Sequence, residues 1–172
     1  REKGLATAAK KAGRIAAEGM VKALVDTEKK VGVVVEVNAE TDFVAKNAEF
    51  QEMVTVIAQT IINENPADVD ALNGLKAVGM EMTVADLVTE KIQKIGENMK
   101  IRRFVRYEGK VVSYIHGGGK IGVLVNFETE ADADNAELVA CGKNVAMQIA
   151  AMNPAFLDEA SVPADVIEKE KA

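Results

Sequence analysis

One short motif combines a histidine with three glycines, His116-Gly117-Gly118-Gly119, and such a motif lines the oxyanion hole of some α/β-hydrolases. That chemistry also needs a nucleophile on a sharp turn, and the sequence holds no Gly-x-Ser-x-Gly pattern. Ser113 lies close to His116 in sequence, but nothing evident completes a triad with them. The glycines fit better as the tip of a β-hairpin, where positive φ angles are needed. Because the nucleophile turn is missing and a hairpin explains the glycines, the sequence argues against a hydrolase.

The sequence contains few of the residues that usually bind metal ions. The chain has one cysteine, Cys141, and one histidine, His116, which are too few for a zinc site built on those ligands. The segment Asp132-Ala133-Asp134-Asn135 looks like the start of a calcium loop, but it lacks glycine at the sixth position and the spaced later ligands. We interpret it as the acidic entry to a helix. We expect no metal and no cofactor, and the cysteine usage favours a reduced, cytoplasmic setting.

Charge and hydropathy restrict the partners. The net charge is −6, which opposes bulk electrostatic capture of nucleic acid or of an anionic membrane. Basic side chains that could touch RNA locally occur in two runs: Lys10, Lys11 and Arg14, and Arg102, Arg103 and Arg106. A solvated charged face is the more common meaning of such runs. The longest uncharged stretch, residues 144–157, has 14 residues, fewer than the roughly 18 that span a bilayer. We expect no membrane binding and no direct nucleic-acid binding.

These residues must be positioned by helices and strands whose periods are visible in the sequence. Apolar residues at helical spacing predict helices over 5–17, from the cap Asn47 up to Pro66, and from the cap Thr83 to Gly96. Alternating valines predict a β-hairpin over 20–37, and residues 101–107 predict a third strand. In that strand we expect an apolar face formed by Ile101, Val105 and Tyr107. The opposite, largely basic face should point to solvent and contains Arg102, Phe104 and Arg106.

The chain repeats itself at an offset of 90 residues. Val31-Gly32-Val33-Val34-Val35 aligns with Ile121-Gly122-Val123-Leu124-Val125. A helix from Asn135 matches the helix from Asn47 once a deletion of two residues in the second copy is allowed for. The predicted class is α+β, with two repeated modules that each pack helices on one face of a small antiparallel sheet. We assign residues 1–18 to an N-terminal linker helix, 19–108 to the first module and 109–172 to the second. The second module lacks a third strand, so we predict a free sheet edge or a borrowed strand there, with a homodimer possible.

The first copy has an extra turn, Thr41-Asp42-Phe43-Val44, which is shortened in the second copy. One hypothesis is a hydrophobic staple, with Phe43 or Val44 packed against the helix that begins after Asn47. The other is an exposed apolar wedge beside an acid, which is typical of an interface anchor. The sequence pattern alone favours the staple.

Three segments together resemble the bacterial elongation factor Ts family: Asn38-Ala39-Glu40-Thr41-Asp42-Phe43-Val44-Ala45-Lys46, Ile95-Gly96-Glu97-Asn98-Met99-Lys100-Ile101-Arg102-Arg103 and His116-Gly117-Gly118-Gly119-Lys120-Ile121-Gly122-Val123-Leu124-Val125. The resemblance covers nearly the whole chain. It implies the family's core, or dimerisation, region without two parts that members carry. These are an N-terminal domain similar to ubiquitin-associated domains and the extreme C-terminus with its returning strand.

The resemblance also implies a function, a partner and site residues. The function is guanine-nucleotide exchange on elongation factor Tu in translation elongation, with no bond-making catalysis. Thr41, Asp42, Phe43 and Val44 match the motif that reaches the GTPase and dislodges its Mg²⁺-side structure, and Ile95, Gly96 and His116 match further contacts. The alternative function that the sequence leaves open is a nucleic-acid-binding module of the translation apparatus.

Overall fold

The computed structural model describes residues 2–171 and combines helices with two antiparallel sheets, which confirms the predicted α+β class. The helices are α1 (Glu2–Lys11), α2 (Asp42–Ala45), α3 (Ala48–Glu64), α4 (Val69–Gly74), α5 (Val84–Ile95), α6 (Ala136–Met152) and α7 (Ala164–Lys171), with a 3₁₀ turn at Glu159–Ser161. The strands are β1 (Glu18–Asp26), β2 (Val31–Ala39), β3 (Met99–Glu108), β4 (Lys110–His116) and β5 (Ile121–Phe127). None of the helices within residues 2–171 has both the length and the apolar composition to cross a membrane.

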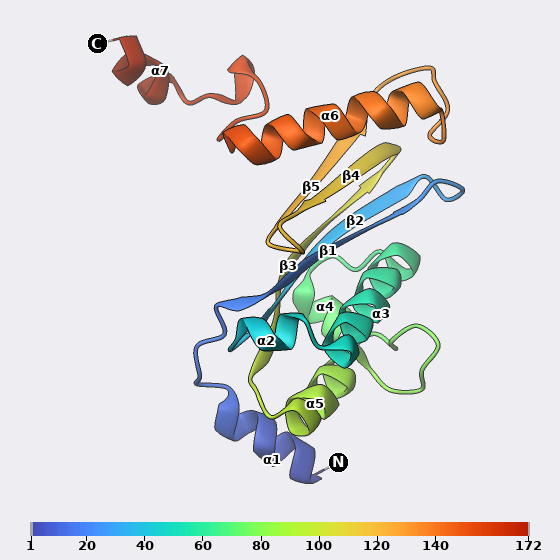
Figure 1. Ribbon diagram of the computed structural model, residues 1–172, viewed down its shortest axis with the longest axis vertical. Helices are drawn as coiled ribbons and strands as arrows, with labels where there is room; N and C mark the ends of the chain where they lie inside the picture. The colour runs from blue at the N-terminus through green and yellow to red at the C-terminus, as the bar shows by residue number, and fades with distance from the viewer. Residues whose placement is uncertain (1, 172) are drawn as a thin grey trace.

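The elements stack in layers, which Figure 1 shows from bottom to top. Helices α2 to α5 lie below the first sheet, whose strand order is β1-β2-β3. The β4-β5 hairpin lies on the other side of that sheet, and α6 covers the hairpin. Both predicted hairpins are therefore present and antiparallel. In the part of the chain that the structure describes, the second sheet contains only β4 and β5.

The main core lies between β2 and α3. Alternate valines of β2 are buried, as expected for the central strand of a half-covered sheet: Val31, Val33, Val35 and Val37. They meet a fully buried stripe of α3 whose members include Phe50, Met53 and Ile57. Each such side chain contributes roughly 1.5–3 kcal/mol on burial. Asn47 begins α3 as predicted, because its side-chain oxygen accepts from the backbone N–H groups of Glu49 and Phe50.

The first helix is shorter than predicted. It ends at Lys11 rather than near residue 17, and a turn and a bend at Gly13 and Arg14 follow it. Asn98 Nδ2 donates to the Arg14 carbonyl oxygen at 2.8 Å, so that carbonyl serves a tertiary contact instead of a helical one. Gly19 lies within β1 at φ 122°. A Cβ there would stand 2.2 Å from the Val37 carbonyl oxygen, so only glycine fits.

The face assignment for β3 is wrong beyond its first residues. Ile101 pairs with Val37 but Arg103 pairs with Glu36, so Arg102 is an extra residue at a β-bulge. The bulge reverses which side chains face the helices. Phe104 packs against the core and the Arg106 side chain is only 11% exposed. Val105 and Tyr107, predicted to be inward, are each 42% exposed on the opposite face.

The two sheets contact each other through a reciprocal pair of glycines and valines. A Cβ built on Gly32 would lie 2.4 Å from Val111 Cγ1, and one built on Gly122 would lie 2.4 Å from Val21 Cγ1. Gly122 is Gly32 displaced by 90 positions, and Val111 is Val21 displaced by the same offset. The two copies of the sequence repeat therefore make the same glycine–valine contact with each other, once in each direction. The absent side chains let the sheets approach closely.

Candidate functional site

The first candidate residues form a single helical turn, α2, that directly follows the central strand β2. Within it Phe43 is 78% exposed, whereas Val44 is 6% exposed and belongs to the core. Of the two residues proposed for the hydrophobic staple, Val44 is therefore the buried one. Phe43 is not part of a staple and projects from the surface.

The turn is held from outside rather than by its own capping. Thr41 occupies the N-cap position with extended backbone, but its side chain makes no hydrogen bond to the helix. Instead the Thr41 N–H donates to Glu97 Oε2 at 3.0 Å, and its hydroxyl donates to Glu97 Oε1 at 2.7 Å. Asp42 accepts from Lys46 Nζ at 3.4 Å on the surface, where such a pair contributes little.

A second carboxylate, that of Glu40, also joins this segment to the loop after α5, but here the loop supplies the donor. Glu40, the residue that follows β2, accepts from the Asn98 backbone N–H at 2.6 Å. We call the set Glu40, Thr41, Glu97 and Asn98 the carboxylate clamp. The clamp joins the α2 turn to the loop after α5, so two candidate segments that are far apart in sequence become neighbours.

The candidates Ile95 and Gly96 lie at the end of α5, where that loop begins. Ile95 is half-buried against the core at the last position of α5. Gly96 follows it as the C-cap, with φ 89° in the left-handed region, as the sequence predicted for a helix stop. Its carbonyl oxygen accepts from Lys11 Nζ, so α1 also contacts this loop.

His116 lies on the second sheet, at the end of β4, and is exposed. Its Nδ1 is 2.9 Å from the Tyr114 hydroxyl oxygen. Gly117, Gly118 and Gly119 that follow all have positive φ, which confirms the hairpin-tip interpretation.

The structure also relates His116 to the clamp and to Ser113. The Gly119 carbonyl accepts from the Val21 N–H at 2.7 Å, near the start of β1, where Glu18 pairs with Ala39 just before the clamp. His116 therefore lies on a hairpin whose tip is bonded to β1, and its own side chain contacts Tyr114 rather than the clamp residues. Ser113 lies three positions before His116 on one strand, so the two side chains project from opposite faces.

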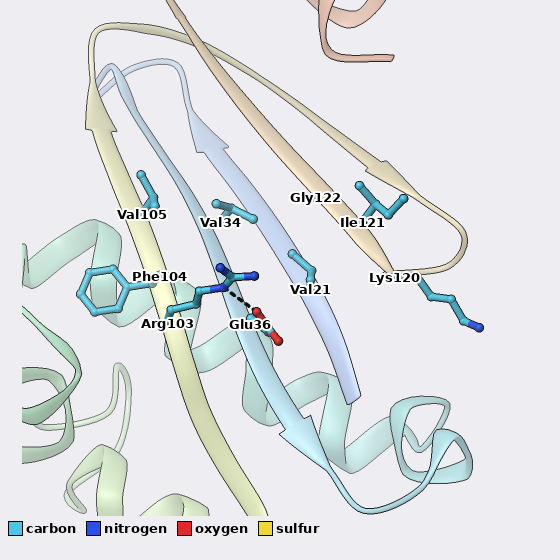
Figure 2. A pocket seen from close by; sticks show the side chains of 9 residues that line it. All are labelled: Val21, Val34, Glu36, Arg103, Phe104, Val105, Lys120, Ile121 and Gly122. Atoms are coloured by element: carbon cyan, nitrogen blue, oxygen red, sulfur yellow. Dashed lines mark hydrogen bonds and ion pairs between the residues drawn. The ribbon is translucent and has the colours of Figure 1, made fainter. Parts of the chain in front are cut away.

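A groove of about 420 Å³ between the two sheets was not anticipated from the sequence, because its walls come from β1, β2, β3 and the start of β5. Figure 2 shows Arg103 and Glu36 joined on the wall that β2 and β3 form, with Arg103 Nε 2.7 Å from Glu36 Oε2. Burial raises the pKa of Glu36, but hydrogen bonds from Arg103 and Asn38 and the charge of Arg103 outweigh it and leave that pKa below its ordinary 4.5.

Lys120 adds a third charged side chain to the lining, and the remaining walls are apolar, including Val34 and Ile121. Among residues 2–171, no three His, Cys, Asp or Glu side chains are grouped so as to hold a metal ion. Among the candidate residues, Phe43 is the large apolar side chain that is most open to solvent, at 78% exposed, whereas Val44 is buried and Ile95 is half-buried.

The family model for elongation factor Ts matches residues 40–172, a range that includes the clamp, the Phe43 turn and His116. The chain belongs to the elongation factor Ts family. Elongation factor Ts of Syntrophotalea carbinolica is 52% identical over 174 residues, covering 99% of this chain and 56% of that protein. Elongation factor Ts of Clostridium perfringens is 51% identical over 174 residues, with the same coverage of both chains. That of Trichlorobacter lovleyi is 50% identical over 177 residues, covering 99% and 57%. The chain thus spans somewhat more than half the length of these elongation factor Ts relatives.

Proposed function

We propose that this chain acts in translation elongation in the cytoplasm, as a guanine-nucleotide exchange factor that binds elongation factor Tu and promotes GDP release. The observation that carries the proposal is the exposure of Phe43. Phe43 is 78% exposed beside the buried Val44, in the turn that matches the family motif, and an exposed aromatic ring held beside a buried neighbour has the geometry of an interface anchor. Membership of the elongation factor Ts family supports the choice of partner.

The proposed mechanism involves no bond-making by this chain. A GTPase holds its nucleotide with a phosphate-cradling loop and a Mg²⁺ ion, so a partner that disturbs the metal side of the site loosens the nucleotide. In the proposal the Phe43 ring enters the GTPase and displaces that side, while Asp42, at the rim of the contact, favours association with it. Ile95, Gly96 and His116 contribute the surrounding contacts.

The energetics require those additional contacts. A 10⁴-fold acceleration of GDP loss corresponds to about 5.5 kcal/mol of differential stabilisation. Burying one phenylalanine side chain supplies only about 1.5–3 kcal/mol. Because coupling between two ligands of one protein is reciprocal, the GDP form of the GTPase must bind this chain more weakly than the nucleotide-free form does.

The state of the basic side chains supports a protein partner over a nucleic acid. Arg103 pairs with Glu36 at 2.7 Å, and Arg106 Nη1 lies 2.6 Å from Glu108 Oε1. Arg14 Nη1 lies 3.6 Å from Glu40 Oε1. Arginines already paired with carboxylates present less free positive charge to a phosphate backbone.

The direct test is the release of fluorescent GDP from elongation factor Tu, measured with and without this chain. We expect faster release that saturates with the concentration of the chain, and a slower release with Phe43→Ala. Leu157→Ala is the matched control, because Leu157 is 95% exposed but lies in the segment after α6. Equal loss in both variants, or no acceleration by the parent chain, would contradict the proposal.

A further inference from the structure

The α2 turn has little intrinsic means of holding Phe43 at a fixed angle. It has four residues, and isolated helices so short do not persist in water. The buried Val44 and a hydrogen bond from Gln51 Nε2 to the Ala45 carbonyl oxygen, at 3.1 Å, hold the C-terminal side of the turn. Neither contact holds its N-terminal side, and the exposed Phe43 ring adds almost no packing of its own. The orientation of the turn must therefore be fixed by contacts outside it.

Glu97 supplies such contacts in a form that fixes both position and rotation. Its two carboxylate oxygens accept separately from the N–H and the hydroxyl of one residue, Thr41, at 3.0 and 2.7 Å. Two hydrogen bonds from one carboxylate to one residue fix the orientation of that residue, whereas a single hydrogen bond leaves it free to rotate about the bond. Both bonds are made to the residue immediately before Asp42 and Phe43.

The second pair of the clamp, Glu40 and Asn98, holds the loop after α5 in place relative to the end of β2. Glu40 accepts from Asn98 N–H at 2.6 Å, so each segment contributes one carboxylate and one donor residue. Asn98 is 8% exposed and also donates to the Arg14 carbonyl, which ties the loop to the chain before β1. The side of the clamp that bears Glu97 is thus fixed, and the Phe43 turn is the part that it positions.

We infer that Glu97 is a positioning residue that sets the orientation in which the turn presents Phe43 to a partner. The inference rests on the proposed exchange function for its consequence, but not for its geometry. Glu97→Ala should lower the maximal rate of GDP release about tenfold, which corresponds to about 1.4 kcal/mol, near the lower limit for one hydrogen bond to a charged group. Glu97→Gln keeps an acceptor and should remain within about threefold of the parent, because neutral hydrogen bonds are roughly half as strong.

The geometry can be tested without elongation factor Tu, because the chain contains no tryptophan and Phe43→Trp introduces a single reporter. Time-resolved anisotropy of Trp at position 43 separates local motion from tumbling of the whole molecule. We expect Glu97→Ala and Thr41→Val each to raise the amplitude of the fast component, and the double variant to add little to Glu97→Ala alone, since Thr41→Val removes one of the two bonds that Glu97→Ala already removes. Glu81→Ala is the control, because Glu81 accepts from Lys76 at 2.9 Å in an exposed loop.

The outcomes separate this inference from the proposed function. If Glu97→Ala leaves the fast component unchanged, the positioning role is wrong whatever the exchange assay shows. If the anisotropy responds as expected but the parent chain does not accelerate GDP release, the proposed function fails and the geometric role of Glu97 stands. Should Glu97→Ala not fold, Thr41→Val removes one of the two bonds without changing the charge and decides the question in the same way.

Discussion

Truncation of Phe43 should separate stability from exchange, and the structure sets the size of the stability effect. With 78% of the side chain exposed, only about a fifth of its surface is removed from water on folding. Full burial of a phenylalanine contributes up to about 3 kcal/mol, so Phe43→Ala should lower the free energy of unfolding by only about 0.5 kcal/mol. The better helix propensity of alanine offsets part of that loss.

The contrasting variant is Phe50→Ala in α3. Phe50 is fully buried, so its truncation should lower the free energy of unfolding by about 3–5 kcal/mol. For a chain of 172 residues each kcal/mol moves the melting temperature by about 2–4 °C. Thermal melts followed by circular dichroism should therefore place Phe43→Ala within about 2 °C of the parent and Phe50→Ala many degrees below it.

The exchange assay then decides the role of the ring. GDP release from elongation factor Tu is followed at a temperature where the parent and Phe43→Ala are both folded. We expect the maximal release rate to fall by about 10- to 100-fold, because the lost contact of about 1.5–3 kcal/mol acts in the dissociation step. A folded Phe43→Ala chain that releases GDP at the parent rate would refute the wedge mechanism, and a melt as low as that of Phe50→Ala would refute the structural assignment.

Four further substitutions test the remaining parts of the site and the fold. Asp42→Ala should slow exchange less than loss of the ring, mainly through slower association that depends on salt concentration, as stopped-flow mixing would show. His116→Ala should weaken affinity for elongation factor Tu in a calorimetric titration while leaving the melting temperature unchanged, since the residue is exposed. Gly122→Ala places a Cβ 2.4 Å from a valine methyl group of β1 and should lower the free energy of unfolding by about 1–3 kcal/mol in urea. The lowered pKa of Glu36 means that its pairing with Arg103 stabilises the fold above about pH 4.5 and is lost as the pH falls through the lowered pKa, so Glu36→Gln should flatten the loss of stability in that window.

Local patterns in the sequence were sufficient for most elements of the fold. Alternating valines identified β2, and the caps Asn47 and Thr83 marked the starts of α3 and α5, because capping depends on residues within one turn. The repeat at an offset of 90 found the second hairpin without any structural information.

Features that depend on residues distant in sequence were not predictable. The bulge at Arg102 exists only in the pairing of β3 with β2, so alternation along β3 alone assigned Phe104 and Tyr107 to the wrong faces. The choice between Phe43 and Val44 depends on the packing of α2 against β1 and β2.

The clamp was missed for the same reason. Its bond from Thr41 to Glu97 joins residues 56 positions apart, and neither residue has an unusual neighbour in sequence. The candidate segments were recognised through the family resemblance, but the contact between them appears only in the fold.

The reciprocal contacts between the sheets have the symmetry of an isologous dimer interface. In such an interface residue i of one subunit meets residue j of the other, and j meets i. Gly32 with Val111 and Gly122 with Val21 satisfy that rule across the offset of 90 residues, with both halves on one polypeptide. A shorter chain with one hairpin could form the same contact with a second copy of itself. Joining the two copies in one chain removes the entropic cost of bringing separate molecules together, and it frees one half to keep the Phe43 turn while the other loses it.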